Sequence, residues 1–442
     1  MRKILLLTLL ATAVAVTPAL AATALVGGTV HTVSGQSYPN GTVVIDNGKI
    51  IAVGANVSVP AGAERIDISG QHVYPGMVAA NSVLGLIEIG SVKGTNDAGE
   101  NGNLNPNARA MVAINHDSEL IPVTRANGVL TAVTATNGGV LSGSSVAWNL
   151  HGWNWEEMAI QEPLAMHLRW PSMTTSTAWW VQKSEEEQKK DREKKLKELT
   201  EAFDNAEAYH KARLSTKKGG AFHPVDVRWE AMVPVLEKKL PLFVHADEFQ
   251  QIEAALDFAK EREFKIVIIG GRDAPRLADR LVKQNVPVVV DNVHQMPRRS
   301  WEPYDAAYTV AARLHEAGVK FCISTGGSTF GASNLRNLPY HAAMAASYGL
   351  PKEEALKAVT MYPAEIIGLG NRLGSIEEGK DANLFVTDGD PLEIMTTVHH
   401  IWIAGEKVDV ASRHTALYER YRERPRRDGK ESALTPSPAE SK

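Results

Sequence analysis

The chain has 442 residues, of which 44% are hydrophobic and 22% charged, and its formal net charge at pH 7 is −4. This length and apolar content are sufficient for a large core and more than one domain, and the small negative charge gives no support for nucleic-acid binding. Cys322 is the single cysteine, which excludes an intramolecular disulfide, and we interpret it as a small buried side chain.

Residues 1–21 have the pattern of a secretory signal peptide. Arg2 and Lys3 precede an apolar run from Ile4 to Val16, and Ala19-Leu20-Ala21 supplies a small-residue cleavage site. We therefore predict export, to a bacterial periplasm, with cleavage after Ala21; the loss of two cations changes the net charge from −4 to −6. No other run reaches the ~18 apolar residues that cross a bilayer, so we expect no membrane span.

Strand signals occur at both ends of the remaining chain. Asn47-Gly48 separates two β-branched runs between Thr42 and Gly54, which is a strong hairpin signal. Alternating strand patterns return between residues 382 and 408. Neither end has enough strands to bury a face alone. We predict that residues 22–72 and 375–412 together form one composite β-sandwich domain.

Between these ends, amphipathic helices alternate with apolar strands. Helices are predicted over residues 248–260, 274–284 and 304–317, and apolar strands over 265–271, 286–293 and 319–327. Strands that are apolar on both faces favour a parallel sheet, and eight such units would close it into a barrel. The sequence therefore predicts an α/β fold in which residues 73–374 form a (β/α)8 TIM-like barrel.

Two charged segments interrupt this pattern. Residues 184–203 are heavily charged and place Leu196, Leu199 and Phe203 at helical spacing. They predict a solvated surface helix within a helical insertion at about residues 184–217, with a partner-binding helix as the alternative. Residues 413–442 predict one exposed helix followed by a disordered tail.

Several long motifs resemble the amidohydrolase superfamily, and within it the imidazolonepropionase-like branch. YPGMVAANSVLGL (residues 74–86) is similar to the family's first barrel strand, and VHADEFQQIEAALDFAKE (244–261) to its fifth strand and following helix. EEALKAVTMYPAEIIGL (353–369) and GSIEEGKDANLFVTDGDPLE (374–393) match its C-terminal signature. The resemblance covers nearly all of residues 24–408 and implies the fold predicted above.

The resemblance also implies a metal site that this sequence does not reproduce. The family's usual ligands are a His-x-His pair on the first strand, a carboxylated lysine on the fourth, histidines on the fifth and sixth, and an aspartate on the eighth; the metal activates a water molecule. Asn81 and Val83 stand in place of the pair, and Thr325 and Gly326 where the aspartate belongs. His245 is the one retained ligand position, on the fifth strand.

The fourth and sixth strands depart from the pattern as well. No lysine occurs between Lys93 and Lys183, and Gly270 and Gly271 are found where the sixth strand would carry a histidine. A zinc site needs three or four protein ligands. We therefore expect no metal cofactor at this degraded site; zinc or another divalent metal would bind only if new ligands have replaced the old ones.

Other acidic and histidine side chains follow the strand ends. The candidate catalytic residues are His245, Asp247, Asp291 and His294, with Glu88 and Glu248 as further candidates. Active sites of such barrels lie at the C-terminal strand ends, where a His–carboxylate pair can act as a general base without a metal. Each candidate has an ordinary alternative: Glu248 can cap the next helix, Asp291 and His294 can form loop hydrogen bonds, and His245 can be an inherited barrel side chain.

The sequence leaves two functions open. The first is an exported amidohydrolase-like hydrolase of a C–N bond, either non-peptide or in a cyclic amide. The second is a catalytically silent relative that binds a small molecule in the barrel mouth, or binds an active amidohydrolase-like partner chain or a second copy of itself. Polar side chains in the mouth suit either function. A periplasmic sugar or peptide receptor is disfavoured by the C-terminal signature.

Overall fold

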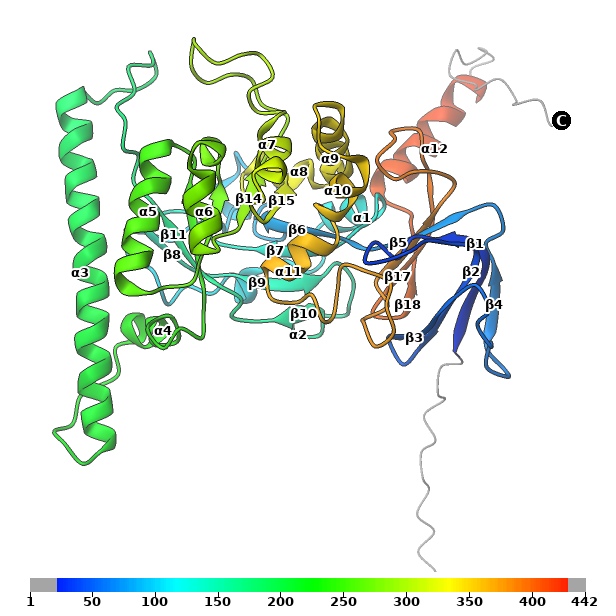
Figure 1. The fold of residues 1–442 in the computed structure, drawn as a ribbon, viewed down its shortest axis with the longest axis horizontal. Coiled ribbons are helices and arrows are strands. Elements are labelled where there is room, and N and C mark those ends of the chain that lie inside the picture. The colour runs from blue at the N-terminus through cyan, green and yellow to red at the C-terminus, as the bar shows by residue number, and fades with distance from the viewer. Residues whose placement is uncertain (1–21, 428–442) are drawn as a thin grey trace, which may run out of the picture.

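The computed structural model describes residues 22–427 and divides them into a β-rich part and a larger α/β part (Figure 1). The predicted signal peptide (residues 1–21) and the predicted tail from residue 428 onward lie outside the described residues. Among residues 22–427, no helix combines the length and the apolar composition needed to cross a bilayer.

The β-rich part joins strands from both ends of the chain in one eight-stranded sheet. Its strands are β1 (Thr23–Val30), β2 (Tyr38–Asp46), β3 (Lys49–Gly54), β4 (Glu64–Asp67), β5 (His72–Pro75), β16 (Leu384–Thr387), β17 (Val398–Ile403) and β18 (Glu406–Val408). The two chain ends meet where β5 pairs antiparallel with β16, with Tyr74 opposite Phe385. The predicted hairpin is confirmed: Asn47 and Gly48 have φ values of 47° and 79° between β2 and β3, as a type I′ turn requires.

This sheet curls back on itself. The backbone nitrogen of Ile50 on β3 donates to the carbonyl oxygen of Lys380 at 2.9 Å, and the nitrogen of Gly379 donates to the carbonyl of Ile50 at 2.8 Å. The edge strand β3 therefore meets the chain just before β16, and the curled sheet encloses a hydrophobic core that includes Val43 and Trp402. The structure has one curled sheet where the sequence predicted two packed sheets.

The α/β part has a TIM-barrel-like arrangement of strands. These are β6 (Met77–Ser82), β7 (Val129–Thr134), β8 (Leu141–Ser144), β9 (Val146–Asn149), β10 (Ala159–Gln161), β11 (Met166–Arg169), β12 (Leu242–Ala246), β13 (Ile266–Gly270), β14 (Val288–Asp291) and β15 (Phe321–Ser324). One sheet has the order β10-β9-β7-β6 and the other the order β15-β14-β13-β12-β11-β8. Only Ser145 separates β8 from β9, so one chain segment links the two sheets. On the other side β15 lies beside β6, where Ser324 Oγ donates to the carbonyl oxygen of Asn81 at 2.9 Å.

The arrangement differs from the predicted closed barrel of eight parallel strands in two ways. β9 runs antiparallel to β7 and β8 antiparallel to β11, and within residues 22–427 no backbone ladder joins β15 to β6. The antiparallel direction follows from chain length. Only residues 135–140 connect β7 to β8, whereas a parallel crossover needs a dozen or more residues.

Helices cover the outside of these strands. They are α1 (Leu120–Arg125), α2 (Trp155–Met158), α4 (Val227–Leu236), α5 (Phe249–Arg262), α6 (Ala278–Gln284), α7 (Val310–Glu316), α8 (Thr329–Ser333), α9 (Leu338–Ser347), α10 (Lys352–Lys357) and α11 (Met361–Ile366). The helix predicted over residues 248–260 is confirmed as α5. The helix predicted over 304–317 is shorter, because residues before Val310 form successive turns with bonds such as Tyr308 N to Asp305 O.

The charged insertion forms the long helix α3 (Glu185–Lys217), which stands at the edge of the molecule beside α4 and α5 (Figure 1). Ser184 and Glu187 close its first turn with a capping box. Phe203 is fully buried, and its ring packs edge-on against Phe258 of α5 with centroids 5.1 Å apart. The predicted exposed helix near the C-terminus is α12 (Arg413–Arg427).

Asn383, at the start of β16, ties the curled sheet to the α/β part. Its Nδ2 donates to Asn149 Oδ1 at 2.8 Å and to Thr131 Oγ1 at 3.2 Å, and its Oδ1 accepts from the backbone nitrogen of Ala404 at 2.7 Å. Asn383, Asn149 and Thr131 are all buried, with Asn383 5% exposed, so the two bonds from its Nδ2 lie out of contact with water.

Replacing Asn383 by alanine should therefore destabilise the protein. The change leaves the nitrogen of Ala404 without this partner and removes the 2.8 Å bond to Asn149 Oδ1, which keeps a longer bond of 3.4 Å from Thr131 Oγ1. We therefore expect the free energy of unfolding to fall by about 1–3 kcal/mol. Urea denaturation would measure it, with Asn101→Ala in an exposed loop as the control. Equal midpoints for the two variants would contradict the linking role of Asn383.

Candidate active site at the strand ends

A polar cavity of about 390 Å³ opens at the carboxyl ends of the α/β strands. Its volume is near the lower end of the range found for small-molecule pockets. The residues singled out in the sequence that line it are Asn81, His245, Asp247, Asp291, Thr325 and Gly326. They come from β6, from β12 and the residue that follows it, from β14, and from the segment after β15. The strand order thus brings together side chains up to 245 positions apart in the sequence.

Val83 and His294 do not line this cavity. Val83 is 1% exposed and packs in the main hydrophobic core; β6 ends at Ser82, so strand alternation no longer directs residue 83 to the side of Asn81. The ring of His294 stacks on His341 of α9 with centroids 4.3 Å apart. Val83, a substituted ligand position, and His294, a candidate catalytic residue, are therefore not brought to the cavity with the other candidates.

Glu88 and Glu248 are also occupied elsewhere. Glu88 accepts a hydrogen bond from Asn115 Nδ2 at 3.0 Å on the exposed loop after β6. Glu248 is the N-cap residue of α5, and its Oε1 accepts from Thr174 Oγ1 at 2.8 Å. Glu248 thus lies at the N-terminus of the next helix, as the alternative interpretation of this residue predicted.

His245 is bonded to a second histidine. Its Nε2 lies 2.9 Å from Nδ1 of His167, which is fully buried on the neighbouring strand β11. Burial, with the positive charge of Arg169 next, lowers the pKa of His167 to about 3, and the same two causes hold the pKa of His245 well below its usual value. Both rings are therefore uncharged at neutral pH, and one donates the shared hydrogen bond to the other.

Asp291 is the most perturbed carboxyl group of the cavity. Its Oδ2 accepts from Asn81 Nδ2 at 2.8 Å, while its Oδ1 is buried without a hydrogen-bond partner in the described chain. Burial, followed by the negative charge of Asp247, raises the pKa of Asp291 to about 7. The group can therefore hold or release a proton near neutral pH, as a general acid or base must.

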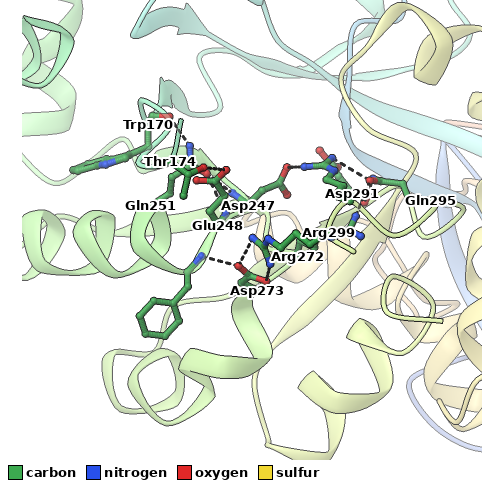
Figure 2. A network of polar contacts seen from close by, with 12 residues as sticks. Trp170, Thr174, Asp247, Glu248, Gln251, Arg272, Asp273, Asp291, Gln295 and Arg299 are labelled. Atoms are coloured by element: carbon green, nitrogen blue, oxygen red, sulfur yellow. Dashed lines mark hydrogen bonds and ion pairs between the residues drawn. The ribbon is translucent and has the colours of Figure 1, made fainter. Parts of the chain in front are cut away.

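Asp247 is held in a polar network that spans the mouth (Figure 2). Asp247 Oδ2 accepts from Arg298 at 2.9 Å, and Arg298 also donates to Gln295 Oε1 at 3.0 Å. Gln251 of α5 accepts from the backbone nitrogen of Asp247 at 3.0 Å and donates to the carbonyl oxygen of Trp170 at 3.0 Å. The network therefore connects the ends of β11 and β12 to the loop that follows β14.

The loop after β14 is fixed from outside the cavity. Arg299 donates two bonds of 2.8 Å to the carboxylate of Asp273, and Arg272 pairs with Glu302 at 2.7 Å (Figure 2). Arg272 and Glu302 are 8% and 5% exposed at their side chains. Removing one partner of such a buried pair would leave an uncompensated charge, so the pairs hold the loop in this position.

Gly270 explains why the sixth strand carries no histidine at that position. Gly270 has φ of +103°, and a Cβ atom there would lie 2.5 Å from Oδ1 of Asp247. A larger residue would have to displace the Asp247 carboxylate. The position of the Asp247 carboxylate therefore requires a glycine at residue 270.

Arg169 is the main site residue that the sequence analysis missed. It ends β11, the fourth strand of the barrel-like arrangement, and lines the cavity. Its guanidinium donates to Asn137 Oδ1, and its Nε is buried without a partner in the described chain. A signal was present: in MHLRW, His167 and Arg169 are polar residues two positions apart within an apolar run, and strand alternation points both to one side. Gln251, Gln295 and Arg298 had no comparable signal.

The donor set does not fit the metal site that the family resemblance implies. Residues 22–427 contain no group of three or more His, Cys, Asp or Glu side chains placed to hold a metal ion. Nε2 of His245 is engaged by His167, and Arg169 brings a positive charge into the same cavity. A guanidinium repels a cation and offers it no lone pair. Cys322 adds no ligand, because it is fully buried on β15.

Comparison with known proteins is consistent with the fold. Residues 157–408 match the model of the Amidohydrolase family. The chain is 23% identical over 410 residues to amidohydrolase tasK of Hapsidospora irregularis. This alignment covers 84% of the chain but 40% of tasK, so the chain spans less than half the length of that relative. It is 24% identical over 369 residues to the imidazolonepropionase of Mesorhizobium japonicum, covering 79% of the chain and 86% of the relative.

A solved structure extends the similarity. An amidohydrolase from Thermotoga maritima MSB8 superposes with a TM-score of 0.78 at 27% identity, covering 88% of this chain and 99% of the other. The family match alone includes more than half of the 442 residues. The superfamily resemblance found in the sequence is confirmed, and the chain belongs to the amidohydrolase family.

Proposed function

We propose that this chain is an exported hydrolase that cleaves a C–N bond, non-peptide or in a cyclic amide, of a small molecule bound in the cavity, and that it does so without a divalent metal. The observation that carries the proposal is Asp291. It is a buried carboxyl group with a pKa of about 7, one of its oxygens has no hydrogen-bond partner in the described part of the chain, and it lines a cavity of small-molecule size. Family membership supports the reaction class.

The proposed reaction uses Asp291 for both proton transfers. Its carboxylate takes a proton from water while the water oxygen bonds to the amide carbon, and the resulting carboxylic acid gives that proton to the nitrogen as the C–N bond breaks. Asn81 orients the carboxyl group through its 2.8 Å hydrogen bond. Thr325 Oγ1, which is buried and has no partner in the described chain, is available to donate to the carbonyl oxygen of the substrate.

A second function is favoured by the engagement of His245. Its 2.9 Å bond to His167 and the nearby guanidinium of Arg169 would suit a silent relative that only binds a small molecule. Such a chain could also serve an active amidohydrolase-like partner; the tasK relative is more than twice as long as the region that this chain matches. Activity measurements separate the two functions.

The first test is elemental analysis of the dialysed chain together with assays on a panel of cyclic and non-peptide amides. We expect less than stoichiometric metal and slow hydrolysis, with kcat lowered about 10²–10⁴-fold in Asp291→Asn, because a general base contributes about that factor. Asp117→Asn, in an exposed loop, is the matched control and should keep full activity.

Other outcomes of this test decide against the proposal. Stoichiometric zinc that is lost together with activity in His245→Ala would show that new ligands hold a metal. A metal-free chain that hydrolyses none of the amides would leave binding as the function.

The second test uses the pH dependence of stability. The folded Asp291 carboxyl keeps its proton up to about pH 7, whereas the unfolded chain releases it near the ordinary value of 3.8. Between these values the native state binds more protons, so this group makes the protein less stable as pH rises towards 7. Asp291→Asn removes the effect and keeps an acceptor for Asn81 Nδ2.

The mutant should therefore gain stability relative to the wild type as pH increases. From about pH 5 to about pH 8 the difference in unfolding free energy should shift in favour of the mutant by about 2–3 kcal/mol. Urea titrations at the two pH values measure it, and Asp117→Asn again serves as the control. A difference that stays constant with pH would mean that Asp291 titrates normally and is not the proton-transferring group.

A further inference from the structure

Arg169 is a cation at the cavity that lacks an ionic partner. Within residues 22–427 it forms no ion pair; its polar contact is the neutral amide oxygen of Asn137. Burial lowers the pKa of Arg169, but a guanidinium remains charged in proteins. A charge held away from water without a counter-charge is costly. The guanidinium of Arg169 is therefore a cationic group of the cavity whose charge a bound anion could balance.

None of the other charges of the cavity forms an ion pair with it. Asp247 is already paired with Arg298 at 2.9 Å. Asp291 is near enough for its negative charge to act on Arg169, but its hydrogen bond goes to Asn81, and its raised pKa keeps much of it uncharged near pH 7. Of the two cations that line the cavity, Arg169 is thus the one without an ion-pair partner among residues 22–427.

The unpartnered atoms suggest what would bind. The Nε of Arg169 and the hydroxyl of Thr325 are both buried without a hydrogen-bond partner in residues 22–427, and both residues line the same cavity. Buried polar atoms are rarely left unpaired in native proteins, so a cluster of them indicates a place where a ligand or water completes the bonds. A guanidinium presents parallel N–H groups that match a planar carboxylate.

We propose that the cavity binds a small carboxylate-bearing molecule. Its carboxylate pairs with the guanidinium of Arg169, and the hydroxyl of Thr325 donates a hydrogen bond to another oxygen atom of the same molecule. The inference concerns the cavity of the proposed function and names the substrate class for it, but it rests on binding and not on turnover. The position of Arg169 supports it. The family resemblance implies a carboxylated, negatively charged lysine on this strand to hold cations, whereas Arg169 reverses the sign of the charge there and selects anions.

The experiment measures binding by calorimetry for matched acid–amide pairs: 5-oxoproline with 5-oxoprolinamide, N-acetylglycine with N-acetylglycinamide, and benzoate with benzamide. At least one acid should bind the wild type about 10-fold or more tightly than its amide, because a hydrogen-bonded charge pair contributes about that much. Arg169→Met should abolish the preference. Arg169→Lys should keep part of it, since the charge remains and the paired N–H groups are lost.

Arg280→Gln on α6 is the matched control outside the cavity. It removes a guanidinium that pairs with Asp257 of α5 and does not line the cavity, so the acid–amide preference should change by less than about 3-fold. If Arg169→Met does not fold, the reduced preference of Arg169→Lys carries the test. Inorganic phosphate is measured in parallel; binding of phosphate that depends on Arg169 and exceeds that of every acid would overturn the carboxylate assignment.

Two further results would overturn the proposal: acids that bind no better than their amides, or a preference that survives Arg169→Met. Its failure is distinguishable from failure of the proposed function. A chain that binds acids through Arg169 but hydrolyses nothing supports the anion site and not the hydrolase. A chain that hydrolyses neutral amides and ignores acids does the reverse.

Discussion

Burial of ionisable groups at the strand ends is the constraint on which the rest of this site depends. In a region of low polarity each charge has to be paired or neutralised. His167 and His245 meet this requirement as an uncharged, hydrogen-bonded pair. Asp291 meets it by retaining a proton towards pH 7, and Asp247 by pairing with Arg298. The chemistry available to the cavity follows from these three arrangements and from Arg169, which forms no ion pair within the described chain.

The departure from a regular barrel is part of how the site is built. The six-residue connection that turns β8 antiparallel carries Asn137 to the mouth. There Asn137 accepts a hydrogen bond from Arg169 and donates through Nδ2 to the carbonyl oxygen of Gly327 at 2.9 Å. It thereby holds the end of β11 against the segment that follows β15. If the third unit were parallel, it would need a longer crossover. The short connection would then not bring Asn137, which orients Arg169, to the mouth of the cavity.

The sequence was informative where local patterns decide the structure. The Asn47-Gly48 hairpin, α5 and the family resemblance were visible because turn chemistry, helical periodicity and long motifs are local. The direction of β8 and β9 was not recognised, because short apolar strands look alike whether parallel or antiparallel. His294 was misplaced for a backbone reason. Asn292 has φ of +52°, so the chain turns sharply after β14 and residues beyond it no longer follow strand alternation.

Arg169 was not predicted for a different reason: the family pattern has a lysine on this strand and no arginine, so a comparison with that pattern does not point to Arg169. In MHLRW the signal is instead that residues two apart on a strand share a face. Whether Arg169 compensates Asp291 could not be deduced from sequence, since that depends on the spacing of β11 and β14 across the cavity.

In the proposed function a guanidinium lies in the cavity where the family resemblance implies a metal, and this limits the rate that the site would reach. A bound divalent ion supplies a strong nucleophile by lowering the pKa of its water, and it polarises the substrate carbonyl at the same time. A guanidinium can stabilise negative charge, but it has no coordination site through which to acidify water. If Arg169 is occupied by a substrate carboxylate, it is not free to stabilise the developing oxyanion either. The proton transfers would then fall to Asp291, and general acid–base catalysis alone contributes about 10²–10⁴-fold. A hydrolase built on these residues would therefore be slow, and tight, charge-selective binding would be its more marked property.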